Sequence, residues 1–279
     1  MNNFTQRFLL FIIGLPLLFF LIIYFHRYSD IGWVVLVCIA TYLAAYESLE
    51  LFTPEFRAKR RHLVPAAAVL LPLSVLFGRT AAHETVLIVL AGVYMFLLAV
   101  ELIAWSPREP LRFARHSLGI SSVLLYPGLL MTYPMRFIEF DQPVPAILLF
   151  LLLNFGNDTF AYIFGIVFGR YSRKIVPVSP KKTLIGFIGG FFGSLLTGIS
   201  FYYLYPSLFN VKLHVLIPFF LVIALLADIG DLIESAFKRG VSKKDSGKLM
   251  PGRGGLLDSV DSLLFSAPLF YYIGIILLN

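Results

Sequence analysis

Nine apolar stretches run through this 279-residue chain and constrain its fold more than any other feature. A helix needs about 20 mainly apolar residues to cross a bilayer. Hydrophobic residues make up 58% of the chain and charged residues only 14%, which excludes an ordinary soluble domain. We predict an all-α, polytopic membrane bundle of about nine transmembrane helices, forming one domain with N-terminal helices in 1–143 and further helices and cytoplasmic loops in 144–279. The stretches cover residues 8–25, 31–52, 63–77, 84–104, 117–131, 144–169, 184–205, 213–237 and 262–278.

The distribution of basic residues predicts the orientation of these helices. Lys and Arg accumulate on the cytoplasmic side of a membrane. With the N-terminus inside, 19 of the 23 Lys and Arg residues fall in inner segments. The stretches 63–77 and 117–131 are short enough to be re-entrant or tilted, but removing both would move Arg108, Arg112 and Arg115 outside. We therefore predict nine spans, with the N-terminus inside and the C-terminus outside.

Carboxylates interrupt the apolar stretches in the C-terminal half. Charged side chains are costly inside a membrane, and those that occur there are usually functional. One face of the eighth predicted helix is polar, because four of its side chains fall within about 80° of one another. These four are Asp228, Asp231, Ser235 and Arg239, and the other intramembrane carboxylates are Asp158 and Glu234.

A second carboxylate pair, Asp258 and Asp261, stands at the start of the last predicted helix. Carboxylates from two chain segments suit a hard divalent cation such as Mg²⁺, which usually shares its coordination with substrate phosphates. Considered together, the two pairs favour a metal role. The alternative is that Asp258 caps the helix and that Asp231 pairs with a neighbouring Arg.

Two polar loops combine glycine with lysine. They are KRGVSKKDSGKLMPGRGG, between the carboxylate pairs, and SPKKTLIGFIGG, residues 179–190. Such loops can bring backbone amides and cations close to phosphate oxygens. Neither has the G-x-x-x-x-G-K-[ST] pattern of a Walker A loop. For the glycines at 186, 189, 190 and 193 close helix packing is an alternative, and for Gly193 it is the preferred interpretation.

Polar residues also mark the helix predicted over 144–169. Asn154, Asp158 and Tyr162 share one face and could line a headgroup or nucleotide cavity. An interhelical hydrogen-bond cluster would give the same pattern. Three further glutamates are predicted to pair with nearby Arg clusters at the membrane surface, without a chemical role: Glu47, Glu50 and Glu101.

Two blocks of this sequence resemble the phosphatidate cytidylyltransferase family, also called CDP-diacylglycerol synthases. The first is GDLIESAFKRGVSKKDSGKLMPGRGGLLDSVDS, residues 230–262, which is similar to the C-terminal signature of that family. The second is NDTFAYIFGIVFGR followed by SPKKTLIGFIGG, residues 157–190. The two blocks occur in the family's order and cover roughly the last 125 residues.

The resemblance implies a membrane enzyme with its catalytic part in 144–279. It would transfer the cytidylyl group of CTP to phosphatidic acid, giving CDP-diacylglycerol and pyrophosphate, with Mg²⁺ as cofactor and a second cation as a further candidate. Expected partners are CTP, phosphatidic acid, membrane lipids and a second copy of the chain, with no nucleic acid. The expected location is a bacterial plasma membrane, with the active site on the cytoplasmic side. Carried onto this sequence, the family pattern implies three sets of residues: catalytic Asp231, Asp258, Asp261, Lys244 and Asp245; substrate-binding Lys181, Lys182, Ser235, Arg239, Lys248, Arg253 and Asp158; and metal-binding Asp231, Asp258 and Asp261.

Three positions depart from the family pattern. Arg253 stands where the family has His, Ser259 where it has Arg, and Ile185 where it has an acid. We hypothesise that Arg253 makes the phosphate contact of the missing Arg.

Three other functions are alternatives to cytidylyl transfer onto phosphatidic acid. They are a CTP-dependent polyprenol or phytol kinase, a cytidylyltransferase for another lipid phosphate, and a lipid or ion transporter.

Overall fold

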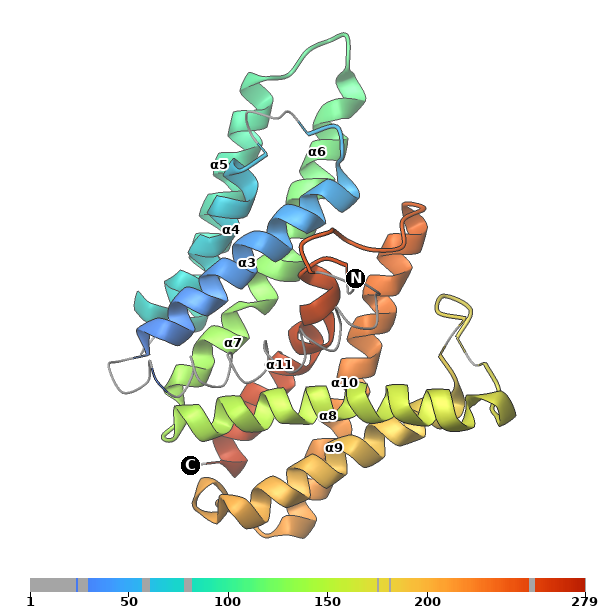
Figure 1. Ribbon diagram of the computed structural model, residues 1–279. Coiled ribbons are helices and arrows are strands. Elements are labelled where there is room, and N and C mark those ends of the chain that lie inside the picture. Colours follow the sequence, from blue (N-terminus) through green and yellow to red (C-terminus); the bar gives the residue numbers. More distant parts are fainter. Residues whose placement is uncertain are drawn as a thin grey trace. The chain divides into compact units, whose positions relative to one another are not determined.

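Helices account for nearly all regular structure in a computed structural model of the chain (Figure 1). The residues it describes are 24, 30–56, 61–77, 82–174, 176–180, 182–250 and 254–278. The predicted stretch 8–25 and the site residues Lys181 and Arg253 lie outside these ranges, apart from Tyr24. The described residues form helices and loops with three isolated β-bridges and no strand, which confirms the all-α prediction.

Seven helical segments in the described ranges are long and apolar enough to cross a membrane. The chain is therefore an integral membrane protein with several spans. An eighth apolar helix, Leu63–Phe77, is shorter, and the predicted count of nine is not confirmed. The seven segments are Ile31–Phe52, Glu84–Ile103, Pro110–Glu139, Pro143–Tyr171, Leu184–Leu204, Leu213–Gly240 and Leu257–Leu277.

The chain divides into two compact units. The first unit comprises residues 1–136 and 241–260. Its main helices pack side by side in Figure 1, α3 against α4 and α6, and α5 against α4 and α6. Buried apolar side chains from all four helices form its core, among them Leu49, Leu71, Leu97 and Ile120. The bounds are α3 Ile31–Phe52, α4 Leu63–Ser74, α5 Ala82–Ile103 and α6 Pro110–Val123.

The short predicted stretch 117–131 is part of a longer, irregular helical segment. After α6 the backbone becomes π-helical over Leu124–Leu129, a segment that contains Pro127. Proline has no N–H to donate to the preceding turn, so a local change of helix type is expected there. The segment continues as α7, Thr132–Arg136, and Phe137–Glu139, and is long enough to span the membrane.

The second unit comprises residues 137–240 and 261–279. Pro143 supplies the first turn of α8 (Pro143–Phe168), where its missing N–H costs nothing. The Thr183 side chain caps α9 (Leu184–Leu204) by accepting a hydrogen bond from Gly186 N at 3.2 Å. The unit also contains α10, Leu213–Gly240, and most of α11, Leu257–Leu277.

Glycines let α8 and α9 pack closely in this unit (Figure 1). A Cβ atom on Gly193 would lie 2.4 Å from the backbone oxygen of Gly156, and one on Gly190 would lie 2.5 Å from Asn157 Oδ1. Both distances are too short for a real side chain. Helix packing, the preferred interpretation for Gly193, is therefore confirmed, and it applies to Gly190 as well.

Candidate active site

In the first unit the residues 241–250 and 254–256, here called the signature loop, fold around the carboxylate of Asp258. Asp258 stands in the first turn of α11. Its Oδ2 atom accepts hydrogen bonds from Ser246 N at 2.9 Å, Ser246 Oγ at 2.9 Å and Gly255 N at 2.7 Å. The bond from Gly255 resembles the backward contact of a capping box. In these contacts Asp258 therefore binds the loop that precedes α11 and not the free N–H groups of the helix itself, so neither the predicted helix cap nor the metal role follows from them.

Glu47 of α3 contacts the same loop, which the sequence analysis did not foresee. It is buried, and it accepts hydrogen bonds from Leu256 N at 3.0 Å and Leu257 N at 2.8 Å. Ser246 Oγ lies 3.1 Å from its Oε2 atom. The prediction that Glu47 serves an Arg cluster is wrong. The available signal was an acid in an apolar stretch, the same signal that singled out Asp228.

The glycines of the signature loop make room for these two carboxylates. A Cβ atom on Gly255 would lie 2.2 Å from Glu47 Oε2, and one on Gly247 would lie 2.5 Å from Glu47 Oε1. Gly254 has a φ of +108° and would place a Cβ 2.5 Å from Asp258 Oδ2. These glycines are explained by contact with side chains of the protein itself. A phosphate-binding role for the loop stays a prediction.

Polar residues of the signature loop extend outward from this anchor. Lys243 Nζ donates a hydrogen bond to the backbone oxygen of Glu50 at 3.0 Å. Glu50 also pairs with Arg61 at 3.0 Å, which confirms its predicted role beside the Arg cluster. Three predicted site residues of the loop are exposed and accessible to a ligand: Lys244, Asp245 and Lys248.

The second unit contains a different polar cluster, here called the helix cluster: Asn157, Asp158, Lys182, Asp228, Asp231 and Asp261. Asn157 Nδ2 of α8 donates a hydrogen bond to Asp228 Oδ1 of α10 at 3.2 Å. Both side chains are buried. Within the described ranges, Asn157 Oδ1 and Asp228 Oδ2 have no hydrogen-bond partner. A buried polar atom without a hydrogen bond destabilises the folded state, so burial of this pair costs free energy of folding.

Asp231 pairs with a cation at the start of α9. Lys182 Nζ forms an ion pair with Asp231 Oδ2 and lies 5.5 Å from the ring centre of Phe187. Ser235 Oγ lies 3.4 Å from Asp231 Oδ1, which agrees with the predicted polar face of α10. Asp231 thus has a basic partner, and it is Lys182 rather than an Arg. Arg239, farther along α10, is exposed.

Asp261 is buried where α10 and α11 approach closely. A Cβ atom on Gly230 would lie 2.6 Å from the backbone oxygen of Asp261, so only glycine fits there. The carboxylate accepts a hydrogen bond from Ser262 N at 2.7 Å. It also interacts electrostatically with the carboxylates of Asp231, Glu234 and Asp158. Three helices of this unit therefore bring acidic groups within electrostatic range of one another.

The chemistry of the helix cluster fits a divalent cation. Its acidic side chains outnumber its single lysine, and hard cations prefer carboxylate oxygens. Across the described part of the chain, however, no three His, Cys, Asp or Glu residues are arranged so that they could hold a metal ion. Asp258 also belongs to the first unit, whereas Asp231 and Asp261 belong to the second. The ligand set Asp231, Asp258 and Asp261 stays a prediction.

The polar stripe of α8 has two kinds of members. Asn154 accepts a hydrogen bond from Ser266 Oγ of α11 at 2.9 Å, so it belongs to an interhelical cluster. Tyr162 is exposed. Asp158 interacts electrostatically with Asp228 and Asp261. Only Asp158 of this stripe therefore lies with the acidic groups of the helix cluster.

Two of the positions that depart from the family pattern have local structural roles. Ser259 Oγ lies 3.4 Å from the backbone oxygen of Gly255, within the start of α11. Ile185 N donates a hydrogen bond to Ser172 Oγ at 3.0 Å at the start of α9. Nothing in these contacts explains the absence of the Arg or of the acid.

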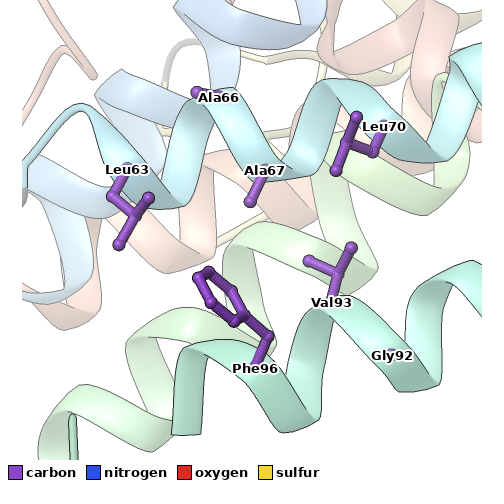
Figure 2. Close-up of a pocket in the computed structure, with 7 residues that line it drawn as sticks. All are labelled: Leu63, Ala66, Ala67, Leu70, Gly92, Val93 and Phe96. Carbon is purple, nitrogen blue, oxygen red and sulfur yellow. The ribbon is translucent and has the colours of Figure 1, made fainter. Parts of the chain in front are cut away.

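A cavity between α4 and α5 of the first unit is unsuited to a nucleotide. Figure 2 shows that the side chains around it contain only carbon atoms. A triphosphate requires cations and hydrogen-bond donors, which these side chains lack. The lining residues are Leu63, Ala66, Ala67, Leu70, Gly92, Val93 and Phe96.

Comparison with known proteins supplies the family. The model of the cytidylyltransferase family matches residues 5–277, nearly the whole chain. The chain belongs to this family. Its match includes both the signature loop and the helix cluster.

Several bacterial relatives carry the name phosphatidate cytidylyltransferase. The protein of Thermotoga maritima is 29% identical over 258 residues, 91% of each chain. That of Staphylococcus aureus strain COL is 44% identical over 124 residues, and that of Staphylococcus haemolyticus is 42% identical over the same length. In both staphylococcal comparisons the matched segment spans 44% of this chain and 46% of the relative.

Proposed function

We propose that this protein transfers the cytidylyl group of CTP to phosphatidic acid, forming CDP-diacylglycerol and pyrophosphate. The observation that carries the proposal is the ion pair between Lys182 and Asp231 beside the buried acids Asp228 and Asp261. A metal–nucleotide complex offers each member of the pair a partner, phosphate for the lysine and a divalent cation for the carboxylate. The T. maritima relative of that name, matched over 91% of both chains, supports the same reaction.

The reaction joins two anions. A phosphate oxygen of phosphatidic acid attacks the α-phosphorus of CTP, and the bond from that phosphorus to the bridging oxygen of the β-phosphate breaks, so that pyrophosphate leaves. The main requirements are alignment of the two phosphates and neutralisation of their charge. When bound, a divalent cation supplies much of that neutralisation, and Asp231 and Asp261 would hold it.

Four basic side chains are candidates for the remaining positive charge. In the second unit these are Lys182, at the start of α9, and Arg239, near the end of α10. In the first unit they are the exposed Lys244 and Lys248 of the signature loop. We assign them to binding of the triphosphate and of the lipid phosphate.

We also propose that the protein works in a bacterial plasma membrane with its site on the cytoplasmic side. CTP is a water-soluble cytoplasmic nucleotide, and the loops that contain the candidate residues are rich in Lys and Arg. Homodimer formation stays a prediction.

The test is to incubate detergent-purified protein with CTP labelled at the α-phosphorus, phosphatidic acid and Mg²⁺, and to extract the lipid. Label in the lipid with release of pyrophosphate is the expected result. The Asp231→Asn variant, which keeps the size of the side chain and removes its charge, should not label the lipid.

The other reactions give different products in the same assay. A lipid kinase would release CDP and leave the lipid free of α-label. A cytidylyltransferase for another lipid phosphate would label the lipid only when that substrate replaces phosphatidic acid. Either result would overturn the proposal.

A further inference from the structure

We infer that Glu47 is a positioning residue that holds the signature loop against α3. Only the part of this inference that concerns catalysis rests on the proposed function. Glu47 lies about 200 residues before the loop in sequence, on a helix to which the sequence analysis assigned no chemistry. The inference depends on three features: the donors that Glu47 accepts, the glycines packed against it, and a second tie between the loop and α3.

The donors come from both ends of the signature loop. Ser246 Oγ, near its start, lies 3.1 Å from Glu47 Oε2, while Leu256 N and Leu257 N, at its end, donate to the two carboxylate oxygens. The first N–H groups of a helix have no partner within that helix. Glu47 accepts from the N–H that opens α11, where a negative charge is also favourable. One carboxylate therefore ties both ends of the loop.

The same geometry connects Glu47 with Asp258. Ser246 Oγ lies within hydrogen-bond distance of both carboxylates, and Gly255 N donates to Asp258 while its Cα faces Glu47. A shift of Glu47 must therefore change the surroundings of Asp258. This connection gives Glu47 influence on a predicted catalytic residue that it does not touch.

A second tie fixes the loop to α3 one helical turn away. Lys243 Nζ donates to the backbone oxygen of Glu50, and the side chain of Glu50 is not used in that bond. Between the two ties the loop presents Lys244 and Lys248 as exposed cations. We expect α3 to hold these cations in the arrangement that binds the triphosphate.

The test compares Glu47→Gln with Glu101→Gln in the full-length protein. Both glutamates are 5% exposed and lie in the first unit, but Glu101 pairs with His116, which lies outside the loop. Two quantities are measured: the rate at which trypsin cleaves after Lys248, and the KM for CTP. The cleavage assay needs no activity, so it separates failure of this inference from failure of the proposed function.

Glu47→Gln should speed cleavage after Lys248 by about tenfold and raise the KM for CTP by a similar factor, because hydrogen bonds to a charged acceptor are lost. Glu101→Gln should change neither, even if it lowers the melting temperature equally. A general loss of folded protein would lower the rate without raising KM. Equal cleavage and equal KM in the two variants would overturn the inference.

A second variant changes the residue on the loop side of the contact with Glu47. Gly255→Ala would place a methyl group 2.1 Å from Ser246 Oγ and 2.2 Å from Glu47 Oε2, the two atoms of this contact, so it should reproduce the faster cleavage. It also serves where Glu47→Gln cannot be purified in folded form. The double variant should show little more cleavage than either single one, since both break the same contact. Additive effects would contradict a shared role.

Discussion

The carboxylates of two polar clusters differ in their hydrogen-bond partners. The first cluster is Glu47 and Asp258 with the signature loop, and the second is the helix cluster. In the first unit, Glu47 and Asp258 accept hydrogen bonds from backbone N–H groups and from Ser246, and glycines pack around them. In the second unit, Asp228 is buried with one oxygen that has no hydrogen-bond partner within the described ranges. Among the described residues, the ion-pair partner of Asp231 is Lys182.

This difference distinguishes carboxylates that fix the conformation of the backbone from carboxylates that are available to bind a ligand. A carboxylate that accepts several N–H bonds is stabilised and organises the backbone around it. A buried carboxylate with few donors costs free energy, and such groups are rare in membrane proteins except where they function. The comparison therefore assigns loop organisation to the first cluster and leaves the second as the candidate for the proposed cation chemistry.

The largest effect is expected for Asp231→Asn, which should lower the rate of lipid labelling by about 10³-fold, because several kcal/mol of charge stabilisation would be lost. The initial rate with labelled CTP measures it. Asp141→Asn, an exposed acid of the same unit, is the matched control and should stay within about threefold of the unchanged protein. Equal rates in both variants would remove the second cluster from catalysis.

Gly193→Ala tests the close packing of α8 against α9, the helix pair that contains part of the helix cluster. Its methyl group would meet the backbone oxygen of Gly156, so we expect a loss of about 3 kcal/mol in stability. Gly165→Ala in the neighbouring helix α8 has open space and should be neutral or slightly stabilising. Thermal unfolding in detergent compares the two, and equal melting temperatures would contradict the tight α8–α9 contact.

Asp258→Asn probes the first cluster. An amide cannot replace the charge that the three donors share, so stability should fall by about 2 kcal/mol. The melting temperature and trypsin cleavage after Lys248 measure the change. A variant that melts like the unchanged protein would show that Asp258 does not organise the loop.

The smallest effect, and the one of opposite sign, is expected for Asp228→Asn. The amide oxygen can still accept the hydrogen bond from Asn157, while the cost of a buried charge disappears. Stability should therefore rise by about 1 kcal/mol as activity falls. If Asp228→Asn and Asp258→Asn both lower the melting temperature, the contrast between the clusters fails.

The sequence alone determined most of the helices, because hydrophobic length is a local property. The predicted stretches 31–52 and 184–205 correspond to α3, Ile31–Phe52, and α9, Leu184–Leu204. The intramembrane acids and the family were also readable from short segments, since charge within an apolar run stands out without any knowledge of its neighbours.

Only the tertiary structure decided which of these acids meet which partners. Glu47 and Leu257 are 210 residues apart, and no local sequence pattern predicts a hydrogen bond between them. The glycines of the signature loop suggested phosphate binding by their composition, whereas their neighbours are the carboxylates of Glu47 and Asp258. A glycine-rich composition shows that the backbone can lie close to another group, but only the folded structure determines whether that group is a ligand or a side chain of the protein.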